Sequence, residues 1–203
     1  MNGDGTLDLI AGNFGGRDRL YLNNGTEDPF QGVIGQDIDQ VKWPTTAVTI
    51  GDVDGDGDLD YVIGNQTLGT YYYSNNGTAN PFQGVSRVRV TTDTHQVVSV
   101  ALGDMDGDGD LDLVGGNSGQ ANRLYLNNGT ANPFEDITGI DITTDTHNTI
   151  PIALGDIDND GDLDVIAGNW EQPSRLYLNN GTANPFQGVT GTDITTDSSR
   201  IYS

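Results

Sequence analysis

A nine-residue acidic segment recurs along the chain at a fixed spacing and constrains the fold more than any other feature. It reads DVDGDGDLD at 52–60, DMDGDGDLD at 104–112 and DIDNDGDLD at 156–164, and a shortened copy, NGDGTLD, occupies 2–8. Each complete copy begins 52 residues after the previous one. A fixed period of this length is typical of a repeat architecture, in which each repeat is one structural unit that stacks on its neighbours.

The composition of the segment indicates a metal site. Five carboxylates within nine residues repel one another, so we expect a cation among them. Side chains at positions 1, 3 and 5 can converge if the chain curls, and glycine at position 6 (Gly57 in the first complete copy) permits the sharp turn. Oxygen ligands favour a hard ion, and their number favours Ca²⁺ over Mg²⁺. An EF-hand loop is excluded, because its position 12 needs Glu and the chain has Ile63, Gly115 and Ala167.

The residues around each segment predict two strands joined by a hairpin. The flanking apolar runs, TIGD before the first copy and LDYVIGN after it, are short and lack a helical period. An acidic loop at a hairpin tip, with a carboxylate at position 9 in place of the missing Glu, resembles the loop of FG-GAP or VCBS repeats. Such repeats build calcium-binding β-propellers of the integrin-α type.

The resemblance implies a ligand set for each loop: the side chains at positions 1, 3, 5 and 9 and the backbone carbonyl of position 7. In this chain the sets are Asp52, Asp54, Asp56, Asp60 and the carbonyl of Asp58; Asp104, Asp106, Asp108, Asp112 and the carbonyl of Asp110; and Asp156, Asp158, Asp160, Asp164 and the carbonyl of Asp162. The shortened copy keeps Asn2, Asp4, the carbonyl of Thr6 and Asp8, so we expect this fourth, degenerate site to be weak or empty. The alternative, acidic tips that only keep the chain soluble, does not explain Asp at every odd position in three copies.

Each repeat divides into four short strands, the number in a propeller blade. In the second copy we expect them at 47–53, 59–64, 70–74 and 86–91, with a Gly-Asn turn between the second and third. NNGT followed by Pro-Phe is expected to turn between the third and fourth, with its Phe at the outer edge of the blade.

These observations predict an all-β fold: one β-propeller array of four 52-residue, four-stranded blades, the first lacking its innermost strand. The approximate repeats are 1–46, 47–98, 99–150 and 151–203. The third strand begins with Arg in three copies, and we expect this Arg to pair with a carboxylate of a neighbouring blade. NNGT also forms a glycosylation sequon in each repeat, but a turn explains its recurrence without glycosylation.

Charge and cysteine content exclude several classes of protein. The net charge is −22 with only eight Lys and Arg, which excludes a nucleic-acid surface and argues against anionic membranes. There is no Cys, so no disulfide can stabilise the fold, and bound metal is the cross-link that remains available. The sequence contains neither a signal peptide nor a membrane-spanning run. Because such loops fill where calcium is about millimolar, we expect an extracellular or cell-surface protein whose targeting signal is absent from this sequence.

Residues that vary within the uniform repeat are candidate ligand contacts. Trp43, His95 and His147 occupy equivalent positions before the first strand of a blade, and Trp170 follows a Gly-Asn pair. A ring beside polar groups suits a sugar pocket, although a lone Trp at a blade junction can equally be wedge packing.

Three functions remain open at this point. The first is a calcium-stabilised binding or adhesion module with lectin-like recognition of a glycan, or with a protein ligand. The second is a structural fragment of a longer or engineered array with no ligand of its own. The third is the accessory propeller of a polysaccharide-active enzyme. The chain itself is not expected to be an enzyme, because it has only two His and its carboxylates are mostly committed to metal.

We also expect a homo-oligomer, with a dimer favoured. Four blades are few for this family, and two chains could close an eight-bladed ring. Exposed blade faces would otherwise invite aggregation.

Overall fold

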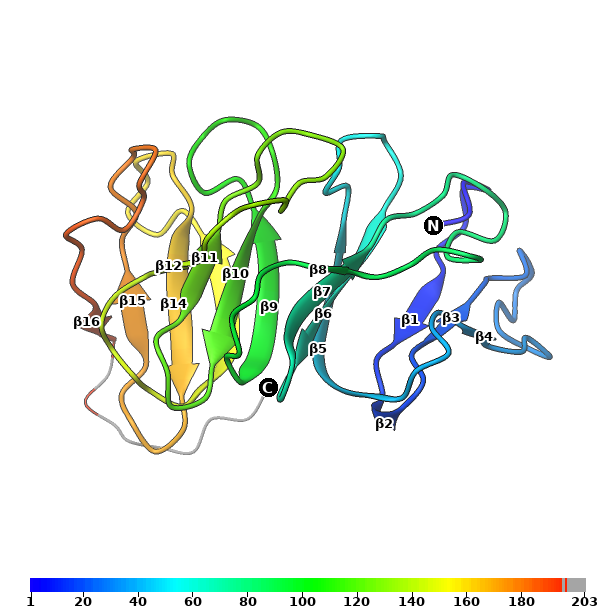
Figure 1. Cartoon of the computed structure of the whole chain (residues 1–203), viewed down its shortest axis with the longest axis horizontal. Helices are drawn as coiled ribbons and strands as arrows, with labels where there is room; N and C mark the ends of the chain where they lie inside the picture. The colour runs from blue at the N-terminus through cyan, green and yellow to red at the C-terminus, as the bar shows by residue number, and fades with distance from the viewer. Residues whose placement is uncertain (195, 197–203) are drawn as a thin grey trace.

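The computed structural model describes residues 1–194 and 196, and within them the chain is all-β. Sixteen strands form four antiparallel sheets that stand side by side, from β1 at one end of the molecule to β15 and β16 at the other (Figure 1). We name these sheets blades 1 to 4. Among the described residues there is no helix that is long and apolar enough to cross a membrane. The predicted array of four β-sheet blades is confirmed.

The strands of each blade follow one another in chain order as an antiparallel meander. Blade 1 contains β1 (Leu9–Ala11), β3 (Arg19–Tyr21) and β4 (Gln36–Asp37). Blade 2 contains β5 (Trp43–Gly51), β6 (Asp60–Asn65), β7 (Gly69–Tyr73) and β8 (Val88–Arg89), with β2 (Phe14–Gly16) added at its inner edge. Blade 3 contains β9 (Val97–Gly103), β10 (Asp112–Asn117), β11 (Arg123–Tyr125) and β12 (Ile140–Asp141). Blade 4 contains β13 (Thr149–Gly155), β14 (Asp164–Asn169), β15 (Arg175–Tyr177) and β16 (Thr192–Asp193).

The four strands of a complete blade are named A to D, and blade 1 has only B, C and D. In blade 2, strands B and C lie within one residue of their predicted positions. Strand A begins at Trp43 instead of residue 47, because its first residues pair with β2 across a blade boundary, with Trp43 opposite Gly16. Strand D spans only Val88–Arg89 instead of 86–91, since its ladder to β7 pairs two residues.

In blades 2 to 4 the Gly-Asn pair ends strand B and does not form the turn that we expected. Gly64 and Asn65 are the last two residues of β6. A Cβ at Gly64 would lie 2.8 Å from Cγ1 of Val97 in the next blade, so glycine is needed here for close packing between blades. Asn65 is buried, and its Oδ1 accepts hydrogen bonds from the backbone N–H groups of Thr67 (3.0 Å) and Leu68 (3.2 Å). The Asn side chain therefore shapes the turn that follows.

The hydrophobic core lies between the blades, in three clusters that we name junctions 1/2, 2/3 and 3/4. The expected place of the NNGT phenylalanine, at the outer edge of its own blade, is wrong. Phe134 of blade 3 packs edge-to-face on Tyr72 of blade 2, with ring centroids 5.9 Å apart. Burial of such a side chain contributes roughly 2 kcal/mol, so these rings join one blade to the next.

The four blades form an open arc. β5 packs against β9, and β13 packs against β9 and β10. No strand of blade 4 makes an extensive contact with blade 1 in the part of the chain that the structure describes. Blades 1 and 4 accordingly stand at opposite ends of the molecule (Figure 1).

Candidate metal sites

Each complete acidic segment forms the hairpin tip between strands A and B. In blade 2 the segment follows β5 and leads into β6, which begins at Asp60. Gly57 has a φ of +95°, in the left-handed region that the expected sharp turn requires. The NNGT turn lies beside the acidic loop, since the backbone N–H of Asn75 donates to Asp60 Oδ1 (2.7 Å). We name this the loop end of the blades; the B–C turns and D–A connections lie at the opposite end.

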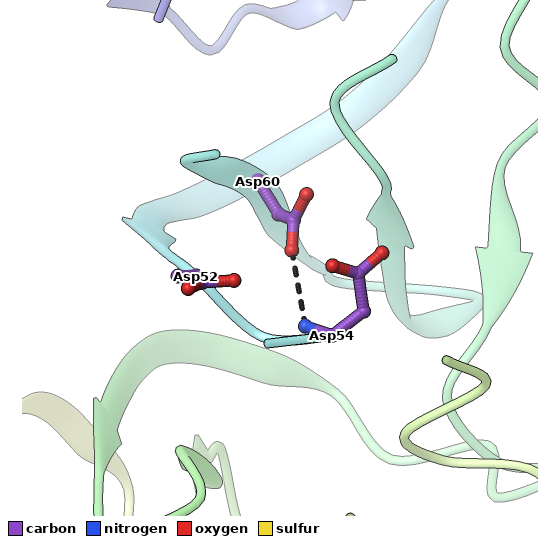
Figure 2. Close-up of side chains that lie close together, drawn as sticks. All are labelled: Asp52, Asp54 and Asp60. Atoms are coloured by element: carbon purple, nitrogen blue, oxygen red, sulfur yellow. Dashed lines mark hydrogen bonds between the residues drawn. The ribbon is translucent and has the colours of Figure 1, made fainter. Parts of the chain in front are cut away.

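Three groups of carboxylates could each hold a metal ion. The groups are Asp52, Asp54 and Asp60; Asp104, Asp106 and Asp108; and Asp156, Asp158 and Asp164. Within each group, one oxygen per residue lies within 4.8 Å of the others. Figure 2 shows the first group, in which the three carboxylates surround one space. The predicted positions 1 and 3 thus meet in every complete loop, position 9 joins them in two loops, and position 5 joins them in one.

The other predicted ligands lie in the same loops but outside these groups. Three of them are side chains: Asp56, Asp112 and Asp160. The remaining three, Asp58, Asp110 and Asp162, were expected to act through the backbone carbonyl. The side chain of Asp110 lies against the NNGT turn: a Cβ built at Gly129 would be 2.8 Å from Asp110 Oδ2. Position 7 thus directs its side chain toward the turn.

Two oxygens of the first group have no hydrogen-bond partner within the protein, although they are buried. They are Oδ1 of Asp52 and Oδ1 of Asp54. A buried polar atom without a partner is costly, and a cluster of carboxylate oxygens suits a hard cation. In the second loop, desolvation and then the charge of Asp108 raise the pKa of Asp106 above its usual value. The residues present therefore fit a bound metal ion.

The aspartate at position 9 anchors each loop. Asp60 and Asp112 are completely buried. Oδ2 of Asp60 accepts from the backbone N–H of Val53 (2.9 Å), while its Oδ1 accepts from Asn75 in the next turn. Burial raises the pKa of Asp60 and of Asp112 to about 6, because desolvation outweighs the hydrogen bonds that favour the charged form. Position 9 thus ties the acidic loop to the NNGT turn.

A recurring asparagine links each loop to the blade before it, a role that our sequence reasoning missed. Nδ2 of Asn127 donates to the carbonyl of Leu111 in its own blade (3.1 Å) and to that of Val53 in blade 2 (2.8 Å). Asn75 and Asn179 also make both kinds of bond. The signal is present in the sequence, because NNGT contains two asparagines whereas an Asn-Gly turn needs only one.

The shortened copy gives its carboxylates other partners. Asp4 accepts hydrogen bonds from the hydroxyl (2.6 Å) and the backbone N–H (2.8 Å) of Thr6 and from the side chain of Asn2 (2.9 Å). These bonds, led by the Thr6 hydroxyl, lower the pKa of Asp4. Oδ2 of Asp8 lies 3.5 Å from the amino group of Met1. A weak or empty fourth site stays a prediction.

Trp43, one of the predicted ligand contacts, is buried at the opposite end of the blades. Its ring lies 5.7 Å from that of Tyr71 and under the guanidinium of Arg87, which is 4.3 Å from the ring centroid. Its indole N–H donates to Asp39 Oδ2 (3.3 Å). These contacts are those of packing between blades 1 and 2.

The other three predicted contacts are half-buried at the same end: His95 lies just before blade 3, His147 just before blade 4, and Trp170 within blade 4. Nδ1 of His95 and Nδ1 of His147 are buried and have no hydrogen-bond partner. Trp170 directly follows β14, and its backbone N–H donates to the carbonyl of Asn148 (2.8 Å). Both Nδ1 atoms are closed to solvent, so only other parts of these half-buried side chains are accessible.

The Arg that begins strand C pairs with a neighbouring blade in blades 3 and 4, as predicted. Arg123 contacts Asp93, in the segment that leaves blade 2 (2.8 Å), and Asp141 of its own blade (2.7 Å). Arg175 makes the same two kinds of contact, with Asp145 (2.9 Å) and Asp193 (2.6 Å). These guanidinium groups are committed to contacts between and within blades.

Comparison with known proteins agrees with this architecture. The model of the FG-GAP-like repeat matches the chain three times, at residues 1–63, 52–115 and 105–167. Each match begins at one acidic segment and ends in the strand after the next, so the family unit has the phase of the repeats described above. A search of curated proteins finds no match. The three matches cover most of the sequence, and the chain belongs to the FG-GAP-like repeat family.

Proposed function

We propose that the chain is a calcium-stabilised β-propeller module in which the three complete loops hold structural Ca²⁺. The observation that carries this proposal is the first carboxylate group, where buried oxygens of Asp52 and Asp54 lack partners beside the buried Asp60. Membership of the FG-GAP-like family and the all-oxygen ligand set support Ca²⁺ as the ion.

The loop residues would join the two inner strands of a blade around the ion. Asp52 and Asp54 leave the end of β5, and Asp60 begins β6, so ligands come from both strands. Bound Ca²⁺ supplies the positive charge that offsets repulsion among the carboxylates. If the ion binds the folded chain but not the unfolded chain, one site adds about 2.7 kcal/mol to the stability when the concentration of free ion is 100 times Kd.

Calorimetric melting in calcium and in chelator tests the proposal. We expect a higher Tm in calcium, and titration calorimetry should show about three ions per chain, with weaker binding of Mg²⁺. Asp54→Asn should lower this stoichiometry. Asp4→Asn in the shortened copy is the matched control and should leave it unchanged. An equal Tm with and without chelator would contradict a structural role for calcium.

We further propose that the opposite end of the blades binds a glycan or protein ligand, with His95, His147 and Trp170 as contacts. The intermediate burial of His95, His147 and Trp170 supports this, because a half-buried ring leaves part of its surface accessible for a ligand to pack on. The burial of Trp43 favours packing as its role. The proposed module is adhesive or lectin-like, non-catalytic, and extracellular or at the cell surface, where calcium is about millimolar.

A glycan array in calcium, followed by titration of any sugar that binds, tests the ligand proposal. His95→Ala combined with His147→Ala should abolish the signal. Glu135→Ala, an exposed change at the loop end, is the control and should preserve it. A sugar bound equally well by both variants would place its site elsewhere. Binding to no glycan or protein would favour the alternative, an array with no ligand of its own.

A further inference from the structure

The last blade exposes one half of the apolar cluster that fills each junction. At junctions 2/3 and 3/4 the leading face of a blade, which meets the following blade, is buried. Its members are Val53, Val62, Tyr72 and Val90 in blade 2, and Met105, Val114, Leu124 and Ile142 in blade 3, each no more than 3% exposed. The equivalent residues of blade 4 are Ile157, Ile166, Leu176 and Ile194. Ile157 is 46% exposed and Ile194 is 48% exposed.

The first blade exposes the complementary half. The trailing face of a blade, which meets the preceding blade, consists of Leu113, Tyr125 and Phe134 in blade 3 and of Val165, Tyr177 and Phe186 in blade 4, each no more than 5% exposed. The equivalent residues of blade 1 are Leu9, Tyr21 and Phe30. Leu9 is 51% exposed and Phe30 is 39% exposed. The two ends of the arc thus carry the two faces of one kind of junction.

A leucine and a glycine fit together at the complete junctions, and the ends separate an equivalent pair. A Cβ at Gly103 of blade 3 would lie 2.8 Å from Cδ1 of Leu163 in blade 4, so the leucine lies directly on the glycine. The same contact joins Gly51 and Leu111 at junction 2/3. In blade 4, a Cβ at the equivalent Gly155 would meet only Ile157 Cδ1, at 3.8 Å. Leu7 of blade 1, the equivalent leucine, is 87% exposed.

Two polar side chains of blade 1, Asn23 and Arg19, make contacts within their own blade but none to another blade among the described contacts. Asn23, equivalent to the asparagines that bond to the preceding blade, donates its Nδ2 to Leu7 of its own blade (3.0 Å). Arg19 pairs with Asp37 of its own blade (3.2 Å), whereas Arg123 also pairs with the segment that leaves the preceding blade. Among the described contacts, both groups lack the inter-blade partner of their equivalents.

We infer that blade 4 of one chain packs against blade 1 of a second copy, head to tail. Leu7 then lies over Gly155, and Leu9 packs on the leading face that includes Ile194. The occupant is a second copy because the chain carries both faces of an interface that it already forms three times internally. Two such contacts close a ring of eight blades from two chains. Blade 1 has no strand A, so the contact lacks the packing that strand A contributes at junction 2/3. It therefore dissociates more readily than an internal junction.

Analytical ultracentrifugation of the chain in calcium tests the inference. The wild type is expected to sediment at twice the chain mass of 21.6 kDa. Leu9→Lys on blade 1 and Ile194→Lys on blade 4 should each weaken self-association more than about tenfold. The matched control is Ile140→Lys, which alters an exposed apolar residue of blade 3, away from both end blades, and should leave the mass unchanged. Calcium-dependent melting confirms that each variant is folded.

A mixing experiment fixes the polarity of the contact. Leu9→Lys and Ile194→Lys retain different intact faces, so an equimolar mixture should form a mixed pair although each variant alone is monomeric. A symmetric contact of blade 1 with blade 1 would leave Ile194→Lys dimeric and overturn the head-to-tail arrangement. A monomeric wild type at every concentration tested would overturn the inference altogether. That result would leave the calcium dependence of melting, and hence the proposed function, unaffected.

Discussion

Junctions 1/2 and 3/4 join neighbouring blades with different residues. At junction 3/4, Arg175 of strand C reaches back to Asp145. At junction 1/2 the cation is Arg87, near strand D, and its carboxylate partner is Asp39 (3.1 Å). There the guanidinium also covers the ring of Trp43. Both junctions place one guanidinium against one carboxylate from the segment before the blade, but neither partner keeps its place in the repeat.

The difference shows that junction positions must change as a set. Tyr71 stands where blade 4 has Arg175, and Arg87 stands where blade 4 has Gly191. A Cβ at Gly191 would lie 2.5 Å from Cε1 of Tyr177, so blade 4 could not accept the Arg alone without rearrangement. The Arg87 arrangement at junction 1/2 and the Arg175 arrangement at junction 3/4 are therefore two separate ways of packing the same backbone repeat.

The largest expected effect comes from removing the buried position 9 carboxylate from a complete repeat. Asp112→Ala leaves the backbone N–H groups of Met105 and Asn127 without an acceptor and should cost about 3–5 kcal/mol in calcium. Asp8→Ala in blade 1 should cost about half as much, because its loop has fewer carboxylates to hold together. Urea unfolding measures both. Equal costs would show that the first repeat is held as firmly as the third.

Removing the strand C arginine should cost more stability in blade 3 than in blade 1. Arg123 is only 14% exposed and serves two carboxylates, so Arg123→Ala should cost about 2–3 kcal/mol by leaving Asp93 and Asp141 unpaired. Arg19 is 44% exposed, and Asp37 keeps a second partner in Arg17, so Arg19→Ala should cost less than about 1 kcal/mol. Thermal unfolding of the two variants gives the comparison, and a larger loss for Arg19→Ala would contradict it.

The pH dependence of stability should have opposite signs with and without calcium. Burial raises the folded pKa of Asp60 and Asp112 to about 6 from 3.8, so the folded chain binds these protons more tightly than the unfolded chain. This contribution is full below pH 3.8 and is lost as the pH rises through 6. In chelator, acidification from about pH 7 to 5 should therefore stabilise the protein by about 1 kcal/mol per group.

In calcium the same acidification should destabilise the protein, because protons compete with the ion for the carboxylates. Asp60→Asn with Asp112→Asn should remove most of the gain seen in chelator. Melting at both pH values measures the two signs. A stability that falls with acidification in chelator would exclude these aspartates as the controlling groups.

The smallest expected effect is the coupling within the first junction. Trp43→His and Arg87→Gly introduce the residues of the other repeats, and their costs should fall short of additivity by about 1 kcal/mol, since each removes the same ring–guanidinium contact. The fluorescence of Trp43 should also respond to Arg87→Gly. Pairing Trp43→His with a change at Arg175 provides the uncoupled control. Additive costs at the first junction would mean that the cation and the ring act independently.

Local chemistry carried much of the prediction. The spacing of Asp and Gly located the acidic loops, and the β6 and β7 strands followed from apolar runs between turn signals. What failed depends on neighbouring blades: Gly64 is explained by Val97 in the next blade, and Phe134 by Tyr72 in the preceding one. A single repeat cannot reveal such contacts, because residues of different repeats meet only after stacking.

In the candidate site, too, the sequence predicted what happens within one loop but not the contacts that come from outside it. Positions 1 and 3 converge because they share one tight loop, which the glycine pattern signals. The complete burial of Asp60 could not be read from the sequence, since its cause is the turn that contributes Asn75 from 15 residues away. Trp43 was open to two readings because its partner, Arg87, belongs to a different repeat position from any other junction cation.

The asparagine bonds across the junctions connect the loops in series. Asn127 holds Asp112 in its own loop through its backbone N–H, and through its side chain it holds the carbonyl of Val53, which lies between Asp52 and Asp54. An ion that orders one loop therefore presents its neighbour with a fixed acceptor. If the loops bind ions as proposed, we expect their filling to be cooperative along the arc, because each ion would stiffen the frame in which the next one binds.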